Sequence, residues 1–333
     1  MAIKPPDLLN RFPSVSDLLD KPPIRALAER WNRSVVAGGV KSFLDELRTD
    51  LQRKAAEMTL PSIRDLADRA AHYVASRQQH ALGVAINATG RIWGSPWTSP
   101  PLSDAALERG IATGREFGLN PNLPDESGSQ LEMLLCRLSG AQIAAVVHSY
   151  AGAVWLALAA LAANREVIVA RAEVADVGET DVLPKLAEAA KTILTEIGTT
   201  NSALAADYER AASPCTAAIL TVNSDSYRII GQTATAELDE LVALAHDREL
   251  VSIAAIGAAP LVDLPSNISW PRRSANATIA AGIDLVLVRG DGLVGGPACG
   301  ILLGSKEIVQ RITAQPLFAA WKLDPQRDRK SVV

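Results

Sequence analysis

The stretch DLVLVRGDGLVGGPACGILLG, residues 284–304, decides the fold class of this chain. Two short apolar runs, 284–289 and 300–304, flank a glycine-rich segment at 290–297. Short runs of branched residues bounded by glycine predict buried strands with a tight turn between them. The glycine-rich segment lacks the glycine spacing and the downstream acid of a dinucleotide-binding loop, so it indicates only a sharp backbone turn.

Similar runs precede this stretch, and amphipathic or alanine-rich segments separate them. The predicted strands are 144–147, 166–170, 192–197, 217–222 and 250–256. The predicted helices are 151–163, 180–190, 203–212, 235–248 and 274–281. Alternation of strands and helices predicts an α/β fold, with a largely parallel sheet covered by helices on both faces.

Residues 138–164 contain no charged side chain, and a segment of this length can span a bilayer. Its middle is polar, however, with the turn HSYAG at 148–152. We therefore divide it into a strand at 144–147, the polar turn, and a helix at 151–163. No contact with a membrane is expected.

Residues 1–80 predict a separate helical domain, because apolar residues recur at spacings of three and four. Ser14 and Ser16 are candidate helix caps. From Lys21 to Lys54 there are eight Lys or Arg and four Asp or Glu. Two interpretations are open: the basic residues are solvated helix faces, or they form a surface that contacts phosphate groups.

The overall composition excludes several classes of protein. Of the 333 residues, 48% are hydrophobic and 21% charged, and the formal net charge is −4. These values exclude a disordered chain and argue against a nonspecific nucleic-acid coat. Cys136, Cys215 and Cys299 are far apart and odd in number, which favours a reducing compartment, and no metal-ligand spacing is present. The first residues lack the apolar run of a signal peptide, so a cytoplasmic location is expected.

Several segments, taken in order, resemble the bacterial selenocysteine synthases (SelA, L-seryl-tRNA(Sec) selenium transferase). The matching segments are FPSVSDLLD at 12–20, INATGRI at 86–92, LLCRLSGA at 134–141, EIGTTNSALAADYERA at 196–211, NSDSYRIIGQT at 223–233 and GDGLVGGPACGILLGSKEIVQRI at 290–312. The resemblance implies a pyridoxal-phosphate (PLP) transferase large domain of the aspartate aminotransferase type, fold type I. It places the helical N-terminal domain at 1–80, the large domain at 81–310, and the truncated start of a small C-terminal domain at 311–333.

The resemblance also locates the chemistry that this sequence lacks. The family's Schiff-base lysine falls at Gly292, and the aspartate that pairs with the pyridinium nitrogen falls at Ala255. Between Lys191 and Lys306 there is no lysine. The guanidinium of Arg289 stays protonated and does not form an imine. A PLP enzyme of this fold needs both the amine and the acid, so no bound cofactor is expected despite the resemblance.

The substrate and phosphate positions are depleted as well. Three family arginines fall at Ser99, Ala319 and Lys322, of which only Lys322 keeps a charge. The remnants of a PLP pocket implied by the resemblance are Ser149, Tyr150, Ala151, Gly152, Asn223 and Asp291. The backbone N–H groups and the Ser149 hydroxyl leave anion binding open at this turn.

Three functions remain open at this stage. The first is a catalytically inactive SelA-like protein that acts as a binding or assembly partner, with tRNA contact through residues 1–80. The second is a related lyase with altered chemistry, for which Asp291, Asp225, His148 and Tyr150 are the candidate acids and bases. The third is an active selenium transferase whose site is completed by a partner subunit. The resemblance implies a homodimer or a larger homo-oligomer. The physiological ligand stays open.

Overall fold

The computed structural model describes residues 13–53, 61–78, 86, 88, 101–115, 130–175, 183–224, 227–268 and 273–323. The chain divides into two compact units, Met1–Ile86 and Asn87–Val333. The second unit includes the residues from 311 onward that we expected to begin a small domain.

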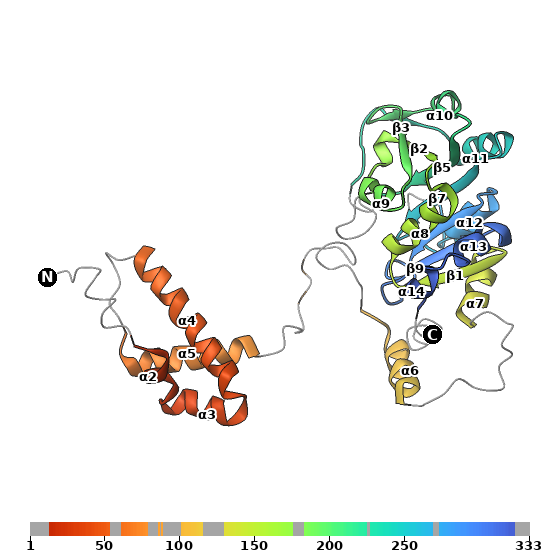
Figure 1. The fold of residues 1–333 in the computed structure, drawn as a ribbon. Helices are drawn as coiled ribbons and strands as arrows, with labels where there is room; N and C mark the ends of the chain where they lie inside the picture. Colours follow the sequence, from red (N-terminus) through yellow and green to blue (C-terminus); the bar gives the residue numbers. More distant parts are fainter. Residues whose placement is uncertain are drawn as a thin grey trace. The chain divides into compact units, whose positions relative to one another are not determined.

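The first unit is helical, as its periodicity predicts (Figure 1). Its helices are α2 (Val15–Leu19), α3 (Pro22–Arg30), α4 (Arg33–Arg53) and α5 (Ile63–Gln78). The Ser14 hydroxyl caps α2 by accepting a hydrogen bond from the N–H of Asp17, and the Asp17 carboxylate accepts one from the N–H of Ser14 at 2.8 Å. This reciprocal pair satisfies donors that the helix itself leaves open. Leu18, Ile24 and Leu44 lie in one buried cluster that joins the helices.

The second unit is built on a seven-stranded sheet with the order β1-β9-β8-β7-β5-β2-β3. Its strands are β1 (Ile143–Val147), β2 (Glu166–Ala170), β3 (Ile193–Ile197), β5 (Thr216–Val222), β7 (Val251–Gly257), β8 (Leu285–Arg289) and β9 (Gly300–Gly304). β9 is antiparallel to both β1 and β8, and the remaining pairs are parallel. All strands except β9 therefore point in one direction, and their carboxyl ends meet at one edge.

Helices cover both faces of this sheet (Figure 1). They are α7 (Gln130–Ser139), α8 (Tyr150–Ala162), α9 (Leu183–Ala189), α10 (Ala205–Ala211), α11 (Leu238–Asp247), α12 (Ala275–Ala280), α13 (Lys306–Thr313) and α14 (Phe318–Trp321). Alternate strand residues divide the core between the two faces. Ala255 faces the cluster that contains α8 and α13, whereas Ala254 and Ile256 face the cluster that contains α7 and α12.

The predicted strands and helices of the second unit are confirmed, each within a few residues of its ends. The interpretation of residues 138–164 as strand, turn and helix is also confirmed, because β1 and α8 occupy that segment. In the part of the chain that the structure describes, no helix is both long and apolar enough to cross a membrane. Several features had no prediction: the helices α6 (Asp104–Arg115), α7, α13 and α14, and a parallel pair formed by β4 (Ser202–Ala203) and β6 (Ala234–Thr235).

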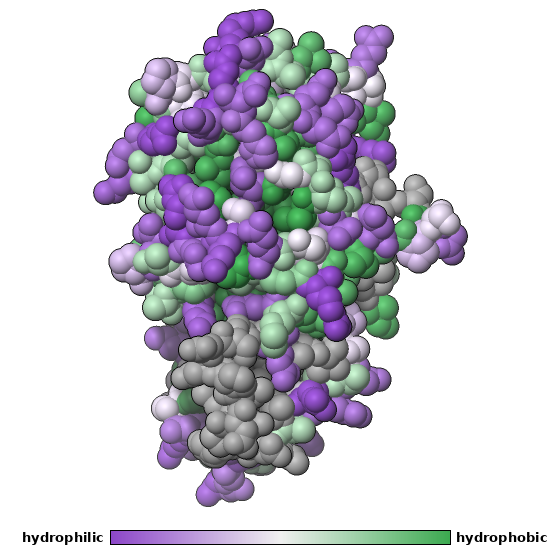
Figure 2. Space-filling view, turned by 90° about the vertical axis from the view of Figure 1, so that its right-hand side faces the viewer, coloured by the Kyte–Doolittle hydropathy of each residue, from purple (hydrophilic) through white to green (hydrophobic). Residues whose placement is uncertain are grey.

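The surface agrees with the mixed composition. On the face shown in Figure 2, hydrophilic side chains predominate and hydrophobic ones gather in patches among them. Such a distribution is ordinary for a folded domain.

Candidate functional site

The turn between β1 and α8 lies at the carboxyl edge of the sheet. Ser149 caps α8, since its hydroxyl accepts a hydrogen bond from the N–H of Gly152 at 3.0 Å. Tyr150 is buried, and its hydroxyl accepts a hydrogen bond from the N–H of Gly257 at 3.0 Å. The start of α8 is thereby joined to the end of β7. Ala151 is half-buried in the same first turn.

The segment around α14 covers the start of α8. The N–H of His148 donates to the carbonyl of Trp321 at 2.9 Å, and Val147 forms an antiparallel bridge with Lys322. A β-carbon placed on Gly152 would lie 2.6 Å from the ring of Trp321, so this ring packs directly on the glycine. Lys322 itself is exposed. The capping hydroxyl of Ser149 and the indole ring therefore occupy much of the space at this helix terminus.

Gly292 is buried in the turn that follows β8. A β-carbon at this position would lie 2.6 Å from the β-carbon of Ala258 and 2.7 Å from its α-carbon. Real β-carbons essentially never come this close to other heavy atoms. In this backbone arrangement, the position accepts no side chain.

Ala255 is fully buried in β7, and its carbonyl accepts a hydrogen bond from the N–H of Asn223 at 2.9 Å. Its methyl group belongs to the same apolar cluster as Val147, Tyr150 and Leu287. This environment favours an apolar residue, because an ionised carboxylate there would lose its hydration without gaining a charged or hydrogen-bonding partner.

Asp291 is buried and pairs with Arg289 through two contacts, of 3.1 Å to Nε and 3.0 Å to Nη2. Both oxygens of the carboxylate are engaged by this fork. The pair thus links the end of β8 to the turn that carries Gly292, and its geometry is that of a structural ion pair.

The comparisons with known proteins agree with this architecture. A sequence profile described as SelA, L-seryl-tRNA selenium transferase, matches residues 87–326. The chain belongs to the SelA family. The L-seryl-tRNA(Sec) selenium transferase of Rhizobium meliloti (strain 1021) is 33% identical over 324 residues, which are 96% of this chain and 69% of that protein. The protein of the same name from Geobacter metallireducens is 34% identical over 325 residues, 95% of this chain and 70% of that protein.

Solved structures show the fold. D-Glucosaminate-6-phosphate ammonia-lyase matches with a TM-score of 0.56 at 19% identity, over 69% of this chain and 62% of that one. A Thermus thermophilus aspartate aminotransferase variant matches with a TM-score of 0.52 at 17% identity, over 72% of this chain and 66% of that one. The fold is that of the PLP-dependent aminotransferases and lyases, fold type I, as expected.

The residues present do not fit the PLP that the SelA family implies. Gly292 offers no amine and no room for one, and Ala255 offers no acid. The ring of Trp321 lies on Gly152, at the turn where the phosphate would be held. Of the remnants expected from the sequence, Ser149, Tyr150 and Gly152 lie together, while Asp291 is engaged by Arg289. Ser99 and Asp225 lie outside the described residues.

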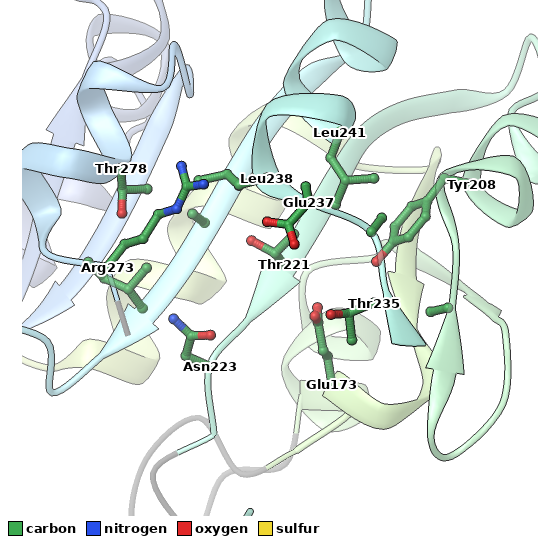
Figure 3. Close-up of a pocket in the computed structure, with 14 residues that line it drawn as sticks. Glu173, Tyr208, Thr221, Asn223, Thr235, Glu237, Leu238, Leu241, Arg273 and Thr278 are labelled. Atoms are coloured by element: carbon green, nitrogen blue, oxygen red, sulfur yellow. The ribbon is translucent and has the colours of Figure 1, made fainter. Parts of the chain in front are cut away.

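A cavity of about 360 Å³ lies at the other face of the sheet, between the ends of β5 and β7 and the helices α10 and α11 (Figure 3). Ala254 and Ile256 line it, whereas Ala255 between them faces α8. Asn223 is the one SelA-site candidate on its wall. The cavity thus occupies a different face from the turn at Ser149.

The carboxylate of Glu173 is the unusual group in this cavity. One of its oxygens accepts a hydrogen bond from the N–H of Val222 at 2.9 Å. Burial nevertheless raises the pKa of Glu173 to about 7. Burial and the neighbouring Glu173 also raise the pKa of Tyr208 above its ordinary value. Glu173 was not predicted from the sequence, although a polar residue just after the apolar strand 166–170 is a usable signal, since such residues gather at the carboxyl ends of parallel strands.

Proposed function

We propose that this chain is a member of the SelA family that does not form a Schiff base with PLP and acts as a binding or assembly partner rather than as a selenium transferase. The contact between Gly292 and Ala258 carries the proposal. A substitution that only removed the lysine would leave its space empty. Here the β-carbon and backbone of Ala258 fill that space, so the turn fits glycine and no larger residue.

Two further observations support the same conclusion. Ala255 is packed in an apolar cluster, where an acid for the pyridinium nitrogen would be costly. Trp321 packs on Gly152 at the turn that would bind the phosphate. At the three positions where the resemblance places contacts with the cofactor, this chain has internal packing, while the sheet and its helices have the fold of the family. Fold and chemistry are separable in this way.

The expected partners follow from the family and the first unit. The relatives named above act on a seryl-tRNA, and in this chain Arg25, Arg33 and Lys41 are exposed on the first unit. Within the described residues none of the three forms an ion pair, whereas Arg48 pairs with Asp45. Exposed Lys and Arg side chains of this kind neutralise phosphates when a nucleic acid binds. We propose tRNA contact through this unit, assembly into a homodimer or a larger homo-oligomer, and a cytoplasmic location.

The deciding experiment is PLP binding. The purified chain is mixed with PLP, its visible spectrum is recorded, and borohydride reduction is followed by peptide mass mapping. The Rhizobium meliloti relative, treated identically, is the positive control. We expect no aldimine band and no stoichiometric adduct in this chain. A stoichiometric adduct on one lysine would overturn the proposal, and the modified residue would identify the group that replaces Gly292.

A further inference from the structure

The cavity beside Glu173 has the features of a ligand site, and of the residues expected at the family's cofactor site only Asn223 lies on its described wall. Its volume of about 360 Å³ lies at the lower end of the range for small-molecule sites. Leu241, Ala254 and Ile256 are buried and form an apolar floor. Asn223, Thr235 and Glu237 are exposed, so the cavity opens to solvent on their side. A small organic molecule fits, and a macromolecule does not.

Several polar groups of the cavity wall have hydrogen-bonding atoms without a partner among the described residues. Glu173 uses one oxygen for the N–H of Val222, and among the described residues the other oxygen has no hydrogen-bond donor. Among the same residues, the side chains of Asn223 and Thr235 form no hydrogen bond. Glu173 and Thr235 are among the side chains that line the cavity (Figure 3). Asn223 and Thr235 are exposed and bind water in the free protein, so their hydrogen-bonding groups are available to a ligand that displaces this water.

The charged side chains of the cavity wall favour a ligand with a positive charge. Glu173 and Glu237 are carboxyl side chains, and Arg273 is the one cation on the described wall. Arg273 is already bound to Asp239 by contacts of 3.2 and 3.4 Å, which neutralise it. The remaining charge is negative and favours a cation. The apolar floor and the hydroxyl and amide groups suit a carbon skeleton that carries hydroxyls.

We propose that this cavity binds a small hydroxylated organic amine, with its ammonium group paired to the carboxylate of Glu173. The ligand's hydroxyls bond to Asn223 and Thr235, and its carbon skeleton lies on Leu241 and Ile256. The proposal does not depend on the fate of PLP, because the cavity lies on the other face of the sheet from Ala255.

The test uses three probes of nearly equal size and isothermal titration calorimetry on the full chain. They are 1-amino-1-deoxysorbitol, which is cationic, sorbitol, which replaces the ammonium with a hydroxyl, and gluconate, which is anionic. We expect saturable binding of the amine, with sorbitol at least tenfold weaker because it cannot form the charge-assisted hydrogen bond. Equal binding of the amine and sorbitol, tighter binding of gluconate, or no saturable binding of the amine would each overturn the proposal.

Variants locate the site. Glu173→Gln keeps the size of the side chain and an acceptor for the N–H of Val222, and it should weaken binding of the amine at least tenfold. The matched control is Glu209→Gln, an exposed carboxylate on α10 that pairs with Arg248 at 2.9 Å, and it should leave binding unchanged. Should Glu173→Gln fail to fold, Glu237→Gln, on an exposed residue, should weaken binding at least threefold. Unchanged binding in both cavity variants would contradict the assignment. An aldimine in the PLP experiment would leave these results untouched.

Discussion

The hydroxyl of Tyr150 accepts a hydrogen bond from the N–H of Gly257 at 3.0 Å, and this bond joins the first turn of α8 to the last residue of β7. Both groups are buried. A buried N–H without an acceptor carries its full desolvation cost. The bond therefore holds the carboxyl edge of the sheet together at the point where the family would bind its cofactor.

Removing this hydroxyl should destabilise the second unit. We expect Tyr150→Phe to lower the free energy of unfolding by about 1–3 kcal/mol, measured by urea denaturation. The matched control is Tyr227→Phe, whose exposed hydroxyl donates to the carbonyl of Ala172. It should cost at most about 0.5 kcal/mol, because water replaces the missing partner. Equal destabilisation of the two variants would contradict the role given to the Tyr150 bond.

Any side chain at position 292 should overlap with Ala258 and destabilise the second unit. Gly292→Ala is expected to lower the free energy of unfolding by about 1–3 kcal/mol, since the new β-carbon overlaps backbone atoms. Gly38→Ala, at a position in α4 with no atom within 4 Å of the new β-carbon, should instead stabilise its helix by about 0.5–1 kcal/mol. Gly292→Lys should neither fold as well as the natural chain nor form an aldimine. A stable Gly292→Lys variant that binds PLP covalently would show that the site is intact apart from one residue.

The carboxyl of Glu173 should make the stability of the second unit depend on pH. Burial raises its pKa in the folded state to about 7 from 4.5, so the folded chain binds more protons than the unfolded chain between these values. Stability therefore falls as the pH rises from about 4.5 through about 7, by on the order of 2–3 kcal/mol. Tyr208, Glu237 and Arg273 are the other ionisable groups of the cavity wall.

The measurement is thermal or urea unfolding of the natural chain and Glu173→Gln from pH 5 to pH 8. The variant should lose less stability over this range and should be the more stable of the two at pH 8. Glu209→Gln, outside the cavity, should follow the natural chain. Parallel curves for the natural chain and Glu173→Gln would show that Glu173 does not titrate in this range.

The basic residues of the first unit should determine tRNA affinity. We expect the triple variant Arg25→Gln, Arg33→Gln, Lys41→Gln to weaken binding of a bacterial tRNA in a filter-binding assay. The slope of log affinity against log salt should decrease by about 0.7–0.9 for each phosphate that the variant no longer neutralises. Arg77→Gln is the control, because Arg77 is held by Glu46 at 2.8 Å. Absence of tRNA binding by the natural chain would favour the alternative that these residues are only a solvated surface.

Much of the fold follows from local pattern. The seven strand predictions depend on short runs of branched apolar residues, and these runs are buried because the strands have helices on both faces. The direction of β9 had no such signal, because a short apolar strand has the same composition whichever way it runs. The helix α6 was missed because its side chains Leu107 and Ile111 are exposed and give no simple apolar stripe.

The sequence by itself determined the family, the α/β fold, the boundaries of most elements, and the absence of a lysine at 292 and an acid at 255, since each depends on residue identity and order along the chain. Only the tertiary structure decided that Ala258 closes the space at Gly292, that Trp321 covers Gly152, and that Glu173 faces a cavity with Thr235 and Asn223. Residues far apart in the chain make these contacts, and their distances depend on how parallel strands place their ends at one edge. A sequence pattern records neighbours along the chain, but the chemistry of a site depends on neighbours in space.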